Sequence, residues 1–86
     1  MQRDSKILYQ AISNVITKVR ESKGIKYTDF CYGNDIPMTT YDSIINASVQ
    51  SSFYNISKVV KALGLTYEEF GKLLDEELPI EYKLEE

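Results

Sequence analysis

Apolar residues recur at every third or fourth position along much of this chain, the spacing that places them on one face of an α-helix. The longest such run predicts a first helix over 5–23, with Gly24 at its C-cap. A second run predicts a fourth helix over 52–63, capped by Ser51 or Ser52. The apolar residues of the first run are Ile7, Leu8, Ala11, Ile12, Val15, Ile16 and Val19, and those of the second are Phe53, Ile56, Val59, Val60 and Leu63.

Two shorter helices are predicted between these runs, joined by a tight corner. The second helix, over 25–34, places Phe30 and Cys31 toward the core. The Gly-Asn-Asp sequence at 33–35 indicates the corner, because these residue types tolerate turn and left-handed conformations. The third helix is predicted over 38–47, and its apolar residues at helical spacing are Tyr41, Ile44 and Ile45.

A capping box predicts the start of a fifth helix, over 67–77. The Thr66 hydroxyl can accept a hydrogen bond from the amide of Glu69, whose carboxylate can accept one from the Thr66 amide. Phe70 lies on the apolar face of this helix. Pro79 stops any continuation, because proline cannot extend a helix that precedes it.

The charge of the chain differs between its body and its end. The 86 residues carry a formal net charge of −3. Residues 1–74 hold nine Lys and Arg against seven acids, whereas 75–86 hold one Lys against six acids. We therefore expect an all-α class, a compact five-helix bundle in one domain over 1–74, with an acidic tail over 78–86.

The residue types that most enzymes use are missing from this sequence. It has no histidine and only one cysteine, so it lacks the residues of a histidine-based triad and the usual ligands of a zinc site. Its four glycines are scattered and form no phosphate-binding loop motif. Cys31, at a core position, is expected to be buried and inert rather than a redox sensor. No apolar run is long enough to cross a bilayer, and the start has no signal-peptide pattern. We expect a cytoplasmic, non-enzymatic protein with no metal or cofactor.

Four segments follow one another in a characteristic order: 19–25 (VRESKGI), 35–36 (Asp-Ile), 39–44 (TTYDSI) and 53–66 (FYNISKVVKALGLT). This order resembles that of the DNA-binding domains of phage repressors, the Cro/Xre-type helix-turn-helix family. Residues 19–25 are similar to that family's LRxxKGLS entry, and 35–36 stand where it has Gly-Ile at the corner. Residues 39–44 (TTYDSI) resemble its recognition helix, STISRI. Residues 53–66 (FYNISKVVKALGLT) match its LETLLKIAKALGVS almost position for position, and 67–70 (YEEF) follow as its LDEL.

The resemblance implies a lambda-repressor-like fold with a helix-turn-helix over 26–47, and a homodimer that binds double-stranded DNA and regulates transcription. Helix 38–47 would enter the major groove. The residues at the family's DNA-contacting positions are Tyr27, Met38, Thr39, Asp42, Ser43, Asn46 and Ser48, with Gln50 a further candidate. Basic residues near the end of the first helix could face phosphates or could be ordinary solvated surface: Lys18, Arg20, Lys23 and Lys26.

The sequence departs from this family where DNA would bind. No Lys or Arg occurs over 27–57, a stretch that contains three aspartates. Ala47 replaces the glycine that commonly closes the recognition helix, so a different exit loop is expected. The alternative is therefore a protein-interaction module that keeps the fold without binding DNA. Its docking face would be Met38–Val49, made by Met38, Tyr41, Ile45 and Val49, and exposure of Ile45 would favour it.

Overall fold

Five α-helices make up the part of the chain that the computed structural model describes, residues 3–79, and this part contains no strand. The predicted all-helical class is confirmed. The acidic tail beyond Pro79 lies outside the described residues. The helices are α1 (Arg3–Ser22), α2 (Tyr27–Gly33), α3 (Met38–Ile45), α4 (Phe53–Ala62) and α5 (Tyr67–Glu77).

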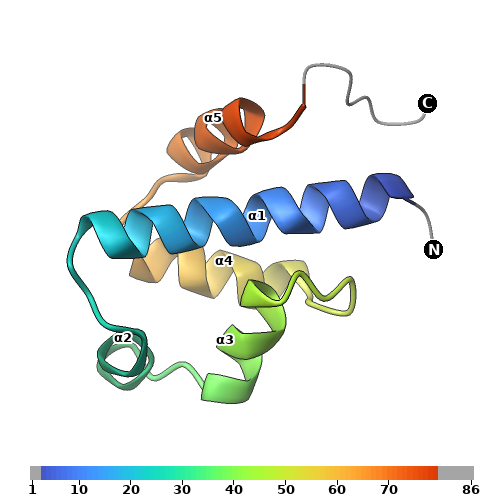
Figure 1. Cartoon of the computed structure of the whole chain (residues 1–86). Coiled ribbons are helices and arrows are strands. Elements are labelled where there is room, and N and C mark those ends of the chain that lie inside the picture. Colours follow the sequence, from blue (N-terminus) through green and yellow to red (C-terminus); the bar gives the residue numbers. More distant parts are fainter. Residues whose placement is uncertain (1–2, 80–86) are drawn as a thin grey trace.

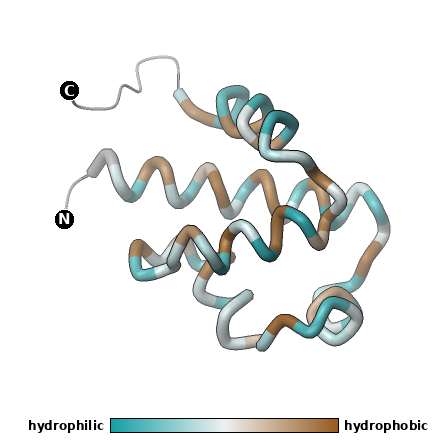
Figure 2. Tube along the Cα trace, turned by 180° about the vertical axis from the view of Figure 1, so that it is seen from behind, coloured by the Kyte–Doolittle hydropathy of each residue, from teal (hydrophilic) through white to brown (hydrophobic). Residues whose placement is uncertain are grey.

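The long helix α1 runs through the middle of the molecule, and the other helices pack around it (Figure 1). In both side views α5 lies on one side of α1, whereas α2, α3 and α4 lie on the other (Figures 1 and 2). The radius of gyration is 12.7 Å, as expected of a compact domain of this size. α1 is therefore the support against which α3 is held.

One continuous core fills the space between the helices, and apolar positions alternate with polar ones along each of the longer helices (Figure 2). Ile16, Tyr41 and Val59 are wholly inaccessible to solvent. The buried cluster comprises Ile12, Val15, Ile16, Phe30, Cys31, Ile36, Tyr41, Ile44, Ile56, Val59, Val60, Leu63 and Phe70. Burial on this scale is the main source of stability, at about 25 cal/mol per Å² of apolar surface.

Phe53 shares the apolar face of α4 but does not belong to the core. Its side chain is 70% exposed, and its ring stacks on Tyr67 with the centroids 6.3 Å apart. Helical spacing identified the correct face of α4, since Ile56, Val59 and Val60 on it are buried. Spacing cannot show that no other helix covers the first residue of that face.

The helix ends carry the expected local signals. The Ser52 hydroxyl accepts a hydrogen bond from the Asn55 amide at 3.1 Å, so Ser52 is the N-cap of α4. Both hydrogen bonds of the capping box join Thr66 and Glu69, at 2.9 and 3.0 Å. Gly24, with φ +69°, ends α1 in the left-handed conformation that glycine adopts readily.

Two residues other than glycine hold a left-handed backbone, and both flank α3. Asp35 has φ 56° in the corner before α3, and Ala47 has φ 60° just after it. The expectation that Ala47 would force a different exit loop is wrong. Alanine takes the left-handed turn here despite the contact between its Cβ and the next carbonyl, which costs about 1–2 kcal/mol.

We expect the substitution Ala47→Gly to raise the free energy of unfolding by about 0.5–1 kcal/mol, because it removes this strain at some cost in backbone entropy. Urea denaturation measures the change. Ala11→Gly is the matched control: Ala11 lies in the interior of the helix α1, where the same substitution lowers stability by about 1 kcal/mol or more. Equal effects at both positions would show that Ala47 is not strained.

Candidate nucleic-acid interface

α2 and α3 are joined by only four residues, 34–37, and two hydrogen bonds fix this connection to α2. The Asn34 side-chain amide donates to the Phe30 carbonyl at 2.9 Å, and the Ile36 amide donates to the Cys31 carbonyl at 2.9 Å. The Ile36 side chain is buried in the core. Pro37 is the N-cap of α3, and its φ of −59° suits the start of a helix. The orientation of α3 relative to α2 is therefore set by buried contacts.

α3 has one buried face and one free face. Tyr41 and Ile44 enter the core, whereas Thr39, Asp42 and Ser43 are exposed. Met38 is 38% exposed at the start of the helix, and Asn46 is exposed at its end. All predicted groove-contacting residues of α3 thus lie on its solvent side.

Tyr41 anchors α3 to three other side chains. Its ring packs edge-on against Tyr27, with centroids 5.0 Å apart, and at a tilt against Phe30, at 5.4 Å. Its hydroxyl accepts a hydrogen bond from Arg20 Nε at 3.0 Å. Burial raises the pKa of Tyr41, and Arg20 partly opposes that rise. The neutral phenol is therefore a fixed part of the support of α3.

Arg20 belongs to this support. Its Nη1 donates to the Ile25 carbonyl at 2.7 Å, in addition to the bond from Nε to Tyr41. The side chain is only 14% exposed. Two of its N–H donors are therefore used within the fold, and a phosphate contact of Arg20 stays a prediction.

A second contact ties the end of α3 to α1. Ser13, a buried polar residue of α1, donates from its hydroxyl to the Ile45 carbonyl at 2.6 Å. Nothing in the sequence indicated this role, because Ser13 stands among ordinary polar residues of an amphipathic helix. Contacts with α2 and α1 therefore hold α3 on its buried side, and its outer face remains exposed to solvent.

The predicted DNA-contacting residues Tyr27 and Asp42 are brought together. The Tyr27 hydroxyl donates a hydrogen bond to the Asp42 carboxylate, which links the first turn of α2 to the middle of α3. The bond occupies one carboxylate oxygen, Oδ1. In a major groove, a carboxylate can accept a hydrogen bond from the amino group of a cytosine. Such a bond to Asp42 would have to use the other carboxylate oxygen.

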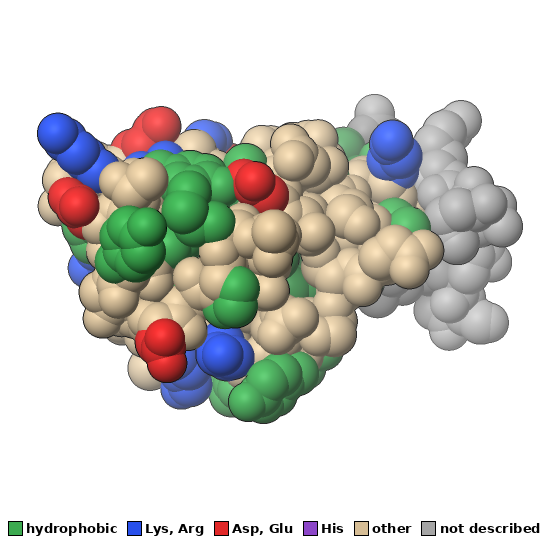
Figure 3. All heavy atoms as spheres, turned by 90° about the horizontal axis from the view of Figure 1, so that it is seen from below, with side chains coloured by type: hydrophobic (Ala, Val, Ile, Leu, Met, Phe, Trp, Pro, Cys, Tyr) green, Lys and Arg blue, Asp and Glu red, His purple; other side chains and the backbone are tan. Residues whose placement is uncertain are grey.

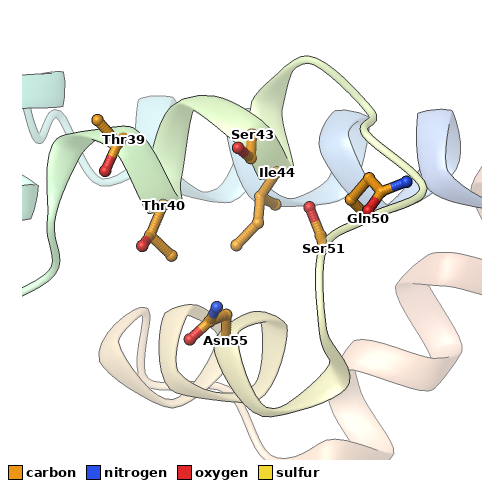
Figure 4. A pocket seen from close by; sticks show the side chains of 7 residues that line it. All are labelled: Thr39, Thr40, Ser43, Ile44, Gln50, Ser51 and Asn55. Carbon is orange, nitrogen blue, oxygen red and sulfur yellow. The ribbon is translucent and has the colours of Figure 1, made fainter.

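A hollow lies between α3 and the start of α4, and polar side chains line most of it (Figure 4). Thr40 and Ile44 point into it from α3, and Asn55 points into it from α4 (Figure 4). The Ser51 hydroxyl is buried and has no hydrogen-bond partner among the described residues. The full lining is Thr39, Thr40, Ser43, Ile44, Gln50, Ser51 and Asn55.

Sequence reasoning identified only part of this hollow. Gln50 was a candidate, but Thr40 and Asn55 were not, because only the packing of α4 beside α3 brings them together. Ser48, predicted to follow the DNA backbone, is half-buried, and its hydroxyl accepts from the Gln50 amide at 3.1 Å. The polar composition of 48–52 was the available signal.

The predicted basic patch is divided. Lys18 forms an ion pair with Glu77 of α5, and this contact lowers the pKa of the Glu77 carboxyl. Lys18 therefore lies with α5 and is not brought together with the α3 residues. Lys23 and Lys26 are exposed at the connection between α1 and α2. Viewed over α2 and α3, basic side chains lie toward the edges of the surface and its centre is mostly uncharged (Figure 3).

The Met38–Val49 face lacks two of its expected members. Tyr41 is wholly buried, and Ile45 is half-buried against the core, so its position does not favour a protein interface. Met38 and Val49 are each 38% exposed. The larger exposed aromatic side chains lie elsewhere: Tyr32, Phe53, Tyr54 and Tyr67.

Cys31 is buried, as predicted, and burial raises the pKa of its thiol. Among the described residues no cluster of acidic or cysteine side chains is arranged to hold a metal ion. None of the helices over 3–79 is both long and apolar enough to cross a membrane. Comparison of the chain with protein-family models, curated proteins and solved structures gives no match.

Proposed function

We propose that the chain is a sequence-specific DNA-binding regulator of the Cro/Xre type, in which α2 and α3 form a helix-turn-helix and α3 enters the major groove. The observation that carries this proposal is the two-sided character of α3. Tyr41 and Ile44 are buried, and Thr39, Asp42 and Ser43 are exposed on the opposite side. A recognition helix needs its base-contacting side chains exposed on a rigid support.

The phosphate contacts of such a complex would be mostly uncharged. Hydroxyl and amide groups line the hollow at the start of α4, and helix N-termini favour phosphate through their free amides and dipole. Gln50 lines the same hollow and is exposed, so its side-chain amide is the donor that a phosphate oxygen can reach there. Lys23 and Lys26 are the cations nearest to the start of α2 in the sequence.

Enrichment of sequences from a random duplex pool, followed by a salt titration, tests this function. We expect a near-palindromic motif, since a homodimer would contact two half-sites. With two lysines of each protomer on phosphates, four in the dimer, the slope of log K against log salt is expected to be about −3.6. No enrichment together with no binding at low salt would contradict the proposal.

Loss of the hydroxyls on α3 should weaken the specific complex. We expect the double substitution Thr39→Ala, Ser43→Ala to weaken binding of the dimer to the enriched motif at least about twentyfold, since four hydroxyl bonds of about 0.5–1.5 kcal/mol each are lost. Ser22→Ala, at the end of α1, is the control and should leave the affinity unchanged. Fluorescence anisotropy with labelled duplex measures both.

A protein-interaction module is the second candidate, and the exposed aromatic rings of α4 and α5 favour it. Phe53 and Tyr54 are 70% and 72% exposed, whereas most large apolar side chains are buried. Aromatic residues are enriched at protein interfaces. This candidate now rests on the surface around α4 rather than on the Met38–Val49 face.

A further inference from the structure

The exposed face of α4 carries two lysines and no acidic residue of its own, and Asp35 is the acidic residue adjacent in sequence to the groove residues Asn34 and Ile36. Lys58 and Lys61 are exposed, and neither forms an ion pair with a described residue. No Asp or Glu occurs anywhere over 43–67. Both lysines belong to an open groove lined by Asn34, Ile36, Tyr54, Ser57, Lys58, Lys61 and Ala62.

Aromatic rings extend this groove. The Lys61 Nζ lies 4.5 Å from the centroid of the Tyr67 ring, and the Lys58 Nζ lies 5.9 Å from that of Tyr54. Phe53 stacks on Tyr67 with an angle of 29° between the rings. We call the groove with Phe53 and Tyr67 the α4 surface. A ligand that matches it would carry negative charges interspersed with apolar side chains.

This chain contains a segment of that composition. Residues 80–86 (IEYKLEE) hold three Glu and one Lys, a net charge of −2 opposite the two lysines of the α4 surface. Between the charges stand Ile80, Tyr82 and Leu84, which can pack on exposed rings. We propose that residues 80–86 of one copy bind the α4 surface of a second copy, and that two such contacts join a symmetric dimer.

Binding within one chain is disfavoured by reach. The first residue of α5, Tyr67, touches α4, but the rest of α5 lies on the other side of α1 from α4 (Figures 1 and 2). The last residue of α5, Glu77, is tied to α1 by Lys18 and Asn14. Only residues 78 and 79 separate Glu77 from the segment 80–86, a reach of about 10 Å, and a helix with its side chains is itself about 10 Å thick. This link is too short to carry the whole segment round α1 to α4. Exchange between two copies avoids this limit and gives a closed twofold assembly.

The proposal supplies the dimer that the proposed DNA-binding function needs, and the oligomeric state measured without DNA tests it separately. Sedimentation equilibrium of the full chain should show a dimer that weakens as salt is added. We expect K58E/K61E, and separately E81K/E85K, to raise the dissociation constant of the dimer at least tenfold. K6E/K72E makes the same change in net charge at two exposed lysines away from α4 and should leave it unchanged.

Mixing the two weakened variants tests exchange between chains directly. In a mixed dimer, the unchanged acidic tail of K58E/K61E meets the unchanged basic groove of E81K/E85K. The other contact pairs the tail made basic in E81K/E85K with the groove made acidic in K58E/K61E, so both contacts join opposite charges. The mixture should therefore dimerise where each variant alone does not. A monomeric wild-type chain, an equal effect of K6E/K72E, or no recovery on mixing would overturn the proposal, and circular dichroism confirms that every variant stays helical.

Discussion

The substitution Arg20→Met is expected to lower the free energy of unfolding by about 2–4 kcal/mol, a large part of the stability of a domain this small. Arg20 donates to the Tyr41 hydroxyl and to the Ile25 carbonyl. Methionine fills similar space but donates no hydrogen bond, so both oxygens lose their partner. The phenol of Tyr41 is wholly buried, where water cannot replace the lost bond. Urea denaturation followed by circular dichroism measures the loss.

Lys18→Met is the matched control, because it removes a basic side chain from the same helix. Its ion pair with Glu77 lies at the surface, where such pairs contribute less than about 1 kcal/mol. Tyr41→Phe completes a double-mutant cycle with Arg20→Met. The double variant should lose less than the sum of the single losses, since both changes remove the same hydrogen bond. Equal losses for Arg20→Met and Lys18→Met would show that Arg20 is not part of the support of α3.

The substitution Phe30→Ala is expected to cost about 3–5 kcal/mol. Phe30 is 1% exposed and packs on the ring of Tyr41, so its removal leaves a cavity between α2 and α3. Because this contact orients α3, the remaining folded protein should also lose affinity for the enriched DNA motif. Thermal and urea denaturation measure the stability, and anisotropy at low temperature measures the binding.

Phe53→Ala is the control, because it removes a phenylalanine ring from the surface of α4 instead of from the core. Phe53 is 70% exposed, and surface substitutions usually change stability by no more than about 0.5 kcal/mol. Comparing the two substitutions separates the effect of Phe30, which supports α3, from the effect of Phe53, which the α4 surface presents to a partner. A large loss for Phe53→Ala would mean that its contact with Tyr67 holds α4 and α5 together.

The positions of the helices followed from local patterns in the sequence. Periodicity, the capping box at Thr66 and the cap at Ser52 each depend on residues within a few positions of one another, so they act in the same way in any tertiary setting. The free side of α3 followed in the same way. Tyr41 and Ile44 lie on one face, and Thr39 and Ser43 therefore point away.

Local patterns failed where a side chain's surroundings come from distant segments. Phe53 lies on the apolar face of α4 but at an end that no helix covers. Lys18 and Arg20 are two residues apart in the sequence. Lys18 pairs with Glu77 of α5 at the surface, whereas Arg20 donates a hydrogen bond to the buried Tyr41 of α3. A charge in a sequence shows that an ion is present, whereas its partner depends on which elements pack against that helix.

By itself the sequence determined the all-helical class, the position of each helix to within about three residues at its ends, the burial of the Tyr41 face of α3 and the absence of cations over 27–57, because spacing, capping and composition are properties of the chain alone. Only the tertiary structure decided that Arg20 supports α3, that Ser13 holds its end, that Ser51 and Asn55 share a hollow with Thr40, and that Lys58 and Lys61 share a groove with Asn34 and Ile36. Each of these depends on contacts between segments far apart in the chain, which no local pattern encodes.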